Sequence, residues 1–364
     1  AFDAANPATI YASSNLGLHK STDGGNQWTF AGAPPPANGF QPAVLTFASD
    51  PKTPSVIYLV TNFGIYKSVN GGRSFELKNN GLLLSSPSAV AIDPVTPTTL
   101  YAAGFQGVFK SVDGAESWRP INTGLTGQAS AVGRLLIDPV RPATVYAATN
   151  RGVFKTINGG TNWSSANNGL QEIGGSGSPA ISALAMDPTN PVILFAGVQN
   201  GVSAAYKTTN GGVSWQAAGT GLQIGISGFN FPLPLTALAI SPANSSVIYA
   251  SSNFGVWKSV DGGATWSADS KGVVSPAIRA LAADAQGNVF AGANPGSDAF
   301  VAQLNVGNVQ AIDRFGYYVA GIVVFDFGKN PDDFDGIQVV KILVQVGDQG
   351  VFSAVVKFFL ALHD

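Results

Sequence analysis

The stretch KSTDGGNQW, residues 20–28, returns five more times along the chain. The six copies, called boxes below, combine a lysine, a hydroxyl side chain, an Asp or Asn, one or two glycines and a final aromatic residue. They occupy residues 20–28, 67–75, 110–118, 155–163, 207–215 and 258–266. Because glycine after Asp or Asn favours a tight turn with positive φ, each box predicts a hairpin.

The boxes belong to a longer repeat. An aromatic residue precedes each box in an apolar segment and recurs once more after the last box. These residues are Tyr11, Tyr58, Tyr101, Tyr146, Phe195, Tyr249 and Phe290, spaced 47, 43, 45, 49, 54 and 41 residues apart. The unit at 89–125 divides into four short strands, AVAI, TTLYAA, GVFKSV and SWRPI, separated by turn residues. Four strands at this period, without helical periodicity over residues 1–315, predict an all-β propeller of four-stranded blades.

Seven blades are favoured over eight. We expect them at about 1–32, 41–82, 87–125, 131–170, 179–222, 235–273 and 277–315. Residues 316–364 diverge from the repeat. There IVVFDF and IQVVKILVQV read as strands, whereas GVFSAVVKFFLAL fits a strand or a helix. This segment predicts closing strands, a degenerate extra blade or a surface for self-association.

The boxes resemble the Asp-box (BNR) repeat, Ser/Thr-x-Asp-x-Gly-x-Thr-Trp, of sialidase-like and sortilin-like propellers. The resemblance covers roughly residues 1–275, and it implies the propeller fold. It implies no activity by itself, because one fold serves many functions. The unit at 278, IRALAADAQGNVFAGANPGSDAFVAQLN, lacks a box and resembles another bacterial propeller repeat.

The acid position of the box argues for a structural role. It holds Asp23, Asn70, Asp113, Asn158, Asn210 and Asp261. Asn keeps the acceptor oxygen and loses the charge, an exchange that a general acid, a nucleophile or a metal ligand does not usually tolerate. The final aromatic residue is expected to pack between sheets. It is Phe75 in one box and otherwise Trp28, Trp118, Trp163, Trp215 or Trp266.

Composition excludes several kinds of site and partner. The net charge of −2 gives no electrostatic case for nucleic acid, and no apolar run is long enough to span a bilayer. The chain has no cysteine and two histidines, which excludes thiolate chemistry and a histidine-rich metal centre, so no cofactor is expected. No signal peptide opens the chain, and its first residues read as the middle of a repeat. Low charge, abundant small polar residues and the lack of cysteine suggest a bacterial protein exported to the cell surface or medium.

Candidate ligand-binding residues lie in the turns between second and third strands. Successive units present Leu16, Phe63, Phe105, Arg151, Asn200 and Phe254 at matching places. Aromatic and arginine side chains around one face would form a rim for a protein or a sugar. The alternative is that each Phe packs on the neighbouring blade.

Long connections between blades offer further candidates. One of them, at 223–235, carries Phe229 and Phe231 among glycines and prolines, and it reads either as a binding loop or as a cover over a sheet edge. Asp332, Asp333 and Asp335 are weak metal candidates. No bidentate Glu follows them at calcium-loop spacing, so a solvated turn is favoured.

Catalysis finds little support. A sialidase resemblance implies a cluster of three arginines, a Tyr–Glu pair and an Asp acid, but the chain lacks the Arg-Ile-Pro motif. Arg134 and Arg279 fall at equivalent first-strand positions and form the best candidate anion site in the central channel. Outside turns, carboxylates are too few to assemble the pair that a glycoside hydrolase needs.

The sequence therefore predicts a non-catalytic exported propeller that binds a protein or glycan or serves as a scaffold or assembly subunit. A sialidase-like or xyloglucanase-like hydrolase remains the alternative. Self-association through residues 316–364 is the further partner hypothesis.

Overall fold

The structure is a computed structural model of the 364-residue chain. It describes residues 2–3, 6–14, 16–84, 87–173, 177–226, 229–269, 278–293, 300–304, 311–314, 339–345 and 351–357. The chain divides into two compact units, Ala1–Ile312 and Asp313–Asp364.

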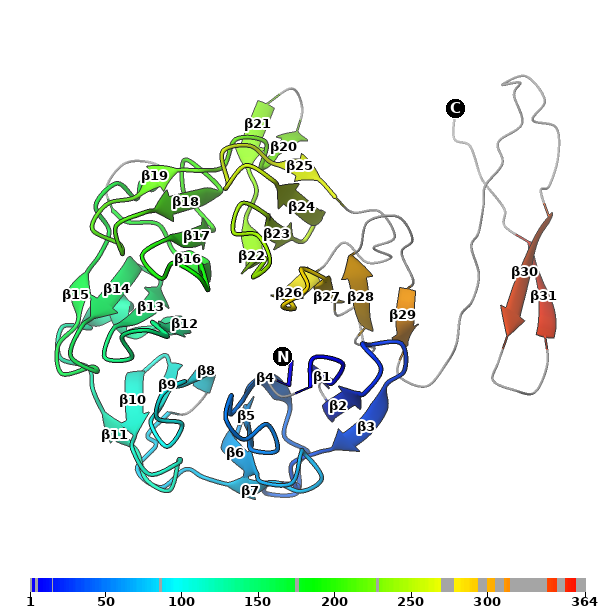
Figure 1. Ribbon diagram of the computed structural model, residues 1–364, viewed down its shortest axis with the longest axis horizontal. Coiled ribbons are helices and arrows are strands. Elements are labelled where there is room, and N and C mark those ends of the chain that lie inside the picture. Colours follow the sequence, from blue (N-terminus) through cyan, green and yellow to red (C-terminus); the bar gives the residue numbers. More distant parts are fainter. Residues whose placement is uncertain are drawn as a thin grey trace. The chain divides into compact units, whose positions relative to one another are not determined.

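The first unit is a β-propeller, which confirms the predicted fold class. Strands that are consecutive along the chain pair antiparallel, and the resulting sheets follow one another around a ring (Figure 1). The first sheet has three strands, β1 (Ile10–Ser14), β2 (Gly17–Ser21) and β3 (Thr29–Gly32). Six four-stranded sheets come after it among the described residues.

The strands of these sheets have the following bounds. The second sheet has β4 (Val44–Ser49), β5 (Ile57–Thr61), β6 (Gly64–Ser68) and β7 (Glu76–Leu77). The third has β8 (Pro87–Ile92), β9 (Leu100–Gly104), β10 (Gly107–Ser111) and β11 (Arg119–Pro120). The fourth has β12 (Val132–Ile137), β13 (Val145–Thr149), β14 (Gly152–Thr156) and β15 (Ser164–Ser165). The fifth has β16 (Ile181–Met186), β17 (Leu194–Val198), β18 (Ala205–Thr208) and β19 (Gln216–Ala217). The sixth has β22 (Leu235–Ile240), β23 (Ile248–Ser252), β24 (Gly255–Ser259) and β25 (Ser267–Ala268). The seventh has β26 (Ile278–Ala283), β27 (Val289–Ala293), β28 (Phe300–Leu304) and β29 (Ala311–Arg314).

The core lies between neighbouring sheets. Every residue of β5, β9, β13, β17 and β23 is buried, as expected for strands covered on both faces. One hydrophobic cluster joins Tyr146 of β13 to Leu194 of β17 and to the box residue Trp215. At the two ends of the ring, the rings of Phe2 and Phe290 meet edge to face with centroids 5.4 Å apart.

The first sheet differs from the others at its inner edge. The strand β1 carries Tyr11 and leads into a box, so it corresponds to the second strand of the other sheets. No described strand pairs with its inner side apart from the bridge Phe2↔Ile10. Residues 12–14 at the end of β1 are consequently half-buried, where the corresponding residues of β5 are fully buried.

Each first strand contains an irregularity at the same place. The register of β4, β8, β12, β16, β22 and β26 shifts by one residue near its start, which is a β-bulge. The bulged residues are Leu45, Ser88, Gly133, Ser182, Thr236 and Arg279. Because these strands line the centre of the ring (Figure 1), the bulges decide which side chains lie there.

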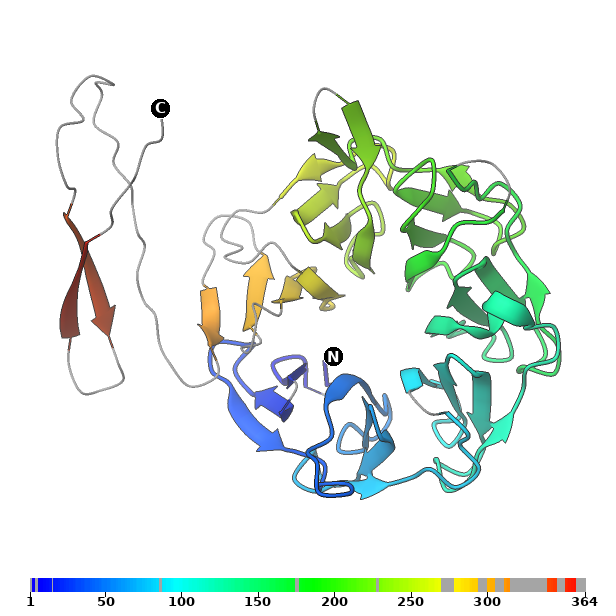
Figure 2. The same cartoon turned by 180° about the vertical axis from the view of Figure 1, so that it is seen from behind.

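Two further elements complete the first unit. A short 3-10 helix, η1 (Gly127–Ser130), precedes β12. The long connection before β22 forms a hairpin of β20 (Gln223–Ile226) and β21 (Phe229–Pro232), which lies at the outer edge of the ring in both views (Figures 1 and 2).

The second unit contains an antiparallel hairpin of β30 (Val339–Gln345) and β31 (Val351–Lys357). The segment that the sequence left open between strand and helix is therefore a strand over Val351–Lys357. Across the described residues, no helix has the length and apolar character that crossing a membrane requires.

Candidate functional site

Each box turn is organised by the hydroxyl at its second position. In the third sheet, Ser111 Oγ donates to Asp113 Oδ1 at 2.7 Å and accepts from the Ala115 N–H at 2.9 Å. Asp113 Oδ1 in turn accepts from the Ser117 N–H at 3.0 Å. The Ser117 hydroxyl and these other donors lower the pKa of Asp113 to about 2, since each bond favours the carboxylate.

Asn at the acid position forms the same network. Thr156 Oγ1 donates to Asn158 Oδ1 at 2.8 Å, and Asn158 Oδ1 accepts from the Asn162 N–H at 3.0 Å. All six boxes share this bond from the N–H four residues later. The six acceptors are Asp23, Asn70, Asp113, Asn158, Asn210 and Asp261. The side-chain oxygen thus binds its own turn whether or not it is charged.

The turns after the first strands use a second set of carboxylates. These aspartates are buried and accept backbone N–H bonds from the residues that follow them: Asp50, Asp93, Asp138, Asp187 and Asp284. Asp138, which is fully buried, also pairs with Arg141 at 2.9 Å. These carboxylates are committed to turns at the same end of the sheets as the boxes.

At the opposite end of the sheets lie the turns between second and third strands. The pairing Thr61↔Gly64 leaves Asn62 and Phe63 in the turn, and Gly104↔Gly107 leaves Phe105 and Gln106. Phe105 therefore corresponds to Asn62 and not to Phe63, so the expected match between the two phenylalanines is wrong by one residue. The extra glycine in GFQG shifted the alignment.

Two kinds of hydrogen bond hold these turns, and the second and fourth sheets have both. Thr61 Oγ1 accepts from the Phe63 N–H at 3.1 Å, and Asn79 donates to the Phe63 carbonyl at 2.9 Å. Asn122 and Asn167 bind the turns of their own sheets in the same way. Hydrogen bonds from within the same sheet thus fix the backbones of these turns, and the bonds do not use the side chains at the turn tips.

The side chains at this end are largely exposed. Phe105 is 69% exposed and Phe254 is 53% exposed, so neither packs fully on a neighbouring sheet. Leu16 and Arg151 are exposed as well, whereas Phe63 is half-buried. These five residues are called the rim below.

The two arginines of the first strands are not equivalent. Arg134 pairs with Ala148 after the bulge of β12, whereas Arg279 is itself the bulged residue of β26 and corresponds to Gly133. Both side chains are exposed, and within β4, β8, β12, β16, β22 and β26 no other charged residue occurs. Desolvation by the surrounding strands lowers the pKa of Arg134, which remains a cation at neutral pH.

The remaining sequence candidates lie on the β20–β21 hairpin or outside the described residues. Phe231 on β21 is 48% exposed, and the backbone of Phe229 pairs with Ile226 across the same hairpin. Asp332, Asp333 and Asp335 lie outside the described residues.

The joints between consecutive sheets contain a motif that sequence reasoning missed. The box lysine reaches across the joint and donates to the carbonyl of the first box glycine of the next sheet. The pairs are Lys67 with Gly114, Lys110 with Gly159, Lys155 with Gly211 and Lys207 with Gly262, at 2.8–3.0 Å. Each of these lysines also lies over the aromatic ring on the second strand of its own sheet, which is Tyr58, Tyr101, Tyr146 or Phe195.

At four joints, the box tryptophan of the following sheet forms a second contact across the joint. Trp163 donates from Nε1 to the Ile121 carbonyl at 2.8 Å, and its N–H donates to Thr123. Gly124 has positive φ, and a Cβ there would lie 2.0 Å from the Trp163 carbonyl oxygen. A Gly-Leu pair follows β7, β11, β15 and β19, at 81, 124, 169 and 221, and this recurrence was the sequence signal for the contact.

Comparisons with known proteins identify the fold. No protein-family model matches the chain, and no curated protein matches it. Among solved structures, the chain is similar to the GH74 xyloglucanase of Xanthomonas campestris, with a TM-score of 0.62 and 17% identity over 83% of this chain. The chain spans 51% of the length of that enzyme.

Two other similar structures are of different kinds. One is YCF48 bound to D1 peptide, with a TM-score of 0.57 and 14% identity over 78% of this chain and 86% of that chain. The other is the extracellular domain of the putative hybrid two-component system BT4673 from B. thetaiotaomicron, with a TM-score of 0.61 and 13% identity over 85% of this chain and 38% of that chain. At these identities the likeness establishes a β-propeller and no activity.

Proposed function

We propose that the first unit is a seven-bladed propeller with boxes of the Asp-box type, and that it serves as a non-catalytic binding protein exported by a bacterium. In this proposal the three-stranded first sheet counts as a blade. The ligand binds at the end of the sheets opposite the boxes, on the rim formed by Leu16, Phe63, Phe105, Arg151 and Phe254.

One observation carries the proposal: the two ends of the sheets are built from different residues. At the box end, Asp or Asn oxygens bind the main chain of their own turns. At the rim end, the turn backbones are already satisfied and exposed Phe105, Phe254 and Arg151 side chains face solvent. Aromatic and arginine side chains are the residues that dominate binding energy in protein interfaces.

A protein segment is the favoured ligand, with a glycan as the alternative. The rim offers separate apolar side chains on fixed turns, which suits side chains of an extended segment. YCF48, a propeller of similar fold, binds D1 peptide, so this architecture is compatible with peptide recognition. A scaffold role that uses residues 316–364 for self-association stays a prediction.

The carboxylates of the described residues speak against a hydrolase. Outside the box turns and the turns after first strands, the carboxylates of the described residues include Glu172, Asp269 and Asp313. Glu172 accepts from Asn200 at 2.7 Å, and Asp269 lies on a different sheet. A glycosidase needs two carboxylates on either side of one bond.

The test compares a rim variant with a matched variant at the other end. We expect Phe105→Ser/Phe254→Ser to lose peptides selected from a displayed random library by the wild-type protein, because the apolar contacts are gone. The control Val112→Ser/Val260→Ser removes two side chains that are 57% and 66% exposed in the box turns, and it should keep those peptides. A glycan array run with the same three proteins tests the alternative ligand.

Equal retention of the selected peptides by both variants would contradict the rim assignment. Cleavage of a glycan on the array by the wild-type protein would contradict the non-catalytic reading.

A further inference from the structure

The joint between the first and second sheets departs from the pattern of the next four. At those joints a box lysine donates to a glycine carbonyl of the following sheet. Lys20 holds the same box position, yet its ammonium lies over the Tyr11 ring at 5.4 Å and forms no hydrogen bond to Gly71. The second box also ends in Phe75, which has no N–H to donate across the joint from its side chain.

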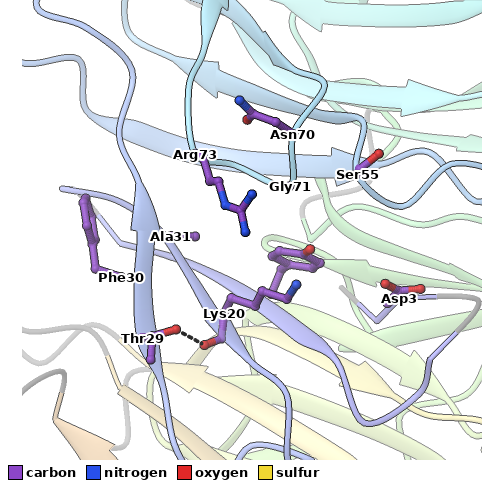
Figure 3. A pocket seen from close by; sticks show the side chains of 10 residues that line it. Asp3, Lys20, Thr29, Phe30, Ala31, Ser55, Asn70, Gly71 and Arg73 are labelled. Carbon is purple, nitrogen blue, oxygen red and sulfur yellow. Dashed lines mark hydrogen bonds between the residues drawn. The ribbon is translucent and has the colours of Figure 1, made fainter.

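A hollow of about 400 Å³ occupies this joint. It is lined by Asp3, Tyr11, Lys20, Thr29, Phe30, Ala31, Ser55, Asn70, Gly71 and Arg73. Figure 3 shows the Lys20 and Arg73 side chains reaching into the hollow from neighbouring walls, with Asn70 and Asp3 at its sides. Lys20 comes from β2, whereas Arg73 comes from the box of the second sheet.

The two cations of the hollow have no anionic partner among the described residues. The ion pairs in that part of the chain involve Lys67, Lys78 and Arg141, and neither Lys20 nor Arg73 takes part. Asp3 does not offset both charges, since its Oδ1 accepts from the Asn6 N–H and it supplies one negative charge against two positive ones. The hollow therefore has an excess of positive charge.

The neighbouring joint displays how such a charge is neutralised. Glu116 holds the box position in the third sheet that Arg73 holds in the second, and its carboxylate lies 3.5 Å from Lys67 Nζ and 2.8 Å from Lys78 Nζ. Ala31 stands three residues after Trp28, as Lys78 stands three residues after Phe75. The first joint thus has Arg73 where the next has the carboxylate of Glu116, and the short Ala31 leaves open the space that the Lys78 side chain fills in the next joint.

We propose that the hollow binds a small organic carboxylate, whose carboxylate group lies between Lys20 and Arg73 in the space that Ala31 leaves free. Lys20 and Arg73 hold the carboxylate, with the Arg73 guanidinium able to form two parallel hydrogen bonds. The Tyr11 ring, Ala31 and Phe30, which is 58% exposed, contact an apolar body attached to it. A volume of about 400 Å³ suits a ligand of modest size.

The carboxylate could come from a free molecule or from an acidic side chain of another protein. Isothermal titration calorimetry separates the two sources with benzoate and with the peptide Ac-Gly-Glu-Gly-NH2 as probes. Benzamide and the matching Gln peptide are the neutral controls. We expect benzoate to bind the full-length protein and benzamide not to bind, because the charge and not the ring is recognised.

The decisive variant is Arg73→Glu, which places a carboxylate of the chain's own in the hollow. We expect it to weaken benzoate binding by about tenfold or more, because one attractive contact becomes repulsive. Pairing with Lys20 should also raise Tm by roughly 1–2 °C, as expected for an exposed ion pair. Lys20→Met should weaken binding without that rise, and Arg119→Gln, on the exposed β11, should leave binding unchanged.

Binding of benzoate and benzamide with equal affinity would overturn the proposal, as would equal benzoate affinity in the wild type and Arg73→Glu. If the Glu peptide binds and benzoate does not, the carboxylate comes from a protein partner, and the site stands. A loss of peptide binding at the rim leaves this result untouched, because the rim lies at the other end of the sheets.

Discussion

At the scale of single residues, the occurrence of both Asp and Asn at the acid position of the boxes indicates that the side-chain oxygen has a structural role. The box oxygen at position 113 or 158 accepts the same backbone N–H at 3.0 Å, although one residue is an acid and the other an amide. The Ser117 hydroxyl, the Ser111 hydroxyl and the Ser117 N–H lower the pKa of Asp113. The last two would serve an amide oxygen as well, and the Ser117 hydroxyl would instead accept from an amide NH2, as Ser74 does from Asn70. A lowered pKa at this position therefore indicates a carboxylate that is hydrogen-bonded to its own turn, and not a catalytic group.

Substitutions at Asp113 test this view directly. We expect Asp113→Asn to change the free energy of unfolding by less than about 0.5 kcal/mol, because the acceptor oxygen remains. Asp113→Ala should cost about 1–2 kcal/mol, because the Ser111 and Ser117 donors lose their partner. Urea denaturation measures both, and Asn158→Asp is the reciprocal control. An Asn variant as unstable as the Ala variant would mean that charge is required.

At the scale of elements, the joints couple one sheet to the next. Two glycines with positive φ near the same connection separate the effect of backbone strain from that of close packing. A Cβ at Gly124 would lie 2.0 Å from the Trp163 carbonyl oxygen, whereas one at Gly127 would meet nothing within 4 Å.

We therefore expect Gly127→Ala to cost about 1 kcal/mol of unfolding free energy from the unfavourable φ alone. Gly124→Ala should cost about 3 kcal/mol or more, because the Trp163 backbone must also move. Chemical denaturation of the two variants gives the difference. Equal costs would show that the joint tolerates the added methyl group.

The sequence predicted the positions of the strands better than it predicted the contacts between neighbouring sheets. Box spacing, Tyr58 and its counterparts located the sheets, because each repeat carries its own turn signals. Phe105 was misaligned, since only the pairing of Gly104 with Gly107 reveals which residues form the turn. The contact of Gly124 with Trp163 was missed because it joins two repeats, and periodicity within one repeat does not describe a contact between neighbours.

At the scale of the whole molecule, stability depends on pH through a residue buried in the first sheet. Burial lowers the pKa of His19 from 6.5 to about 4, and the side chain is 7% exposed. Below pH 6.5 the unfolded chain binds a proton that the folded protein resists, so the free energy of unfolding falls as the pH falls. The loss is complete below about pH 4.

We expect this group alone to account for about 3 kcal/mol of lost stability between pH 6.5 and 4, at 1.36 kcal/mol for each unit of pKa. The pKa of Asp113, at about 2, places the loss from that carboxylate at lower pH, below its ordinary value of 3.8. Urea denaturation at constant ionic strength measures the profile, and His19→Gln should flatten it. An unchanged profile in the variant would assign the pH dependence elsewhere.

The open inner side of β1 has a consequence for how the ring is completed. Among the described residues, the Phe2↔Ile10 bridge is the only pairing on the side of β1 that faces away from β2. An uncapped strand border is a template on which an extended segment can add itself, and main-chain bonding there does not depend on a particular side-chain sequence. Within the described part of the chain, β1 is therefore a strand edge to which an extended segment can add, and Tyr11 of the same strand lines the hollow.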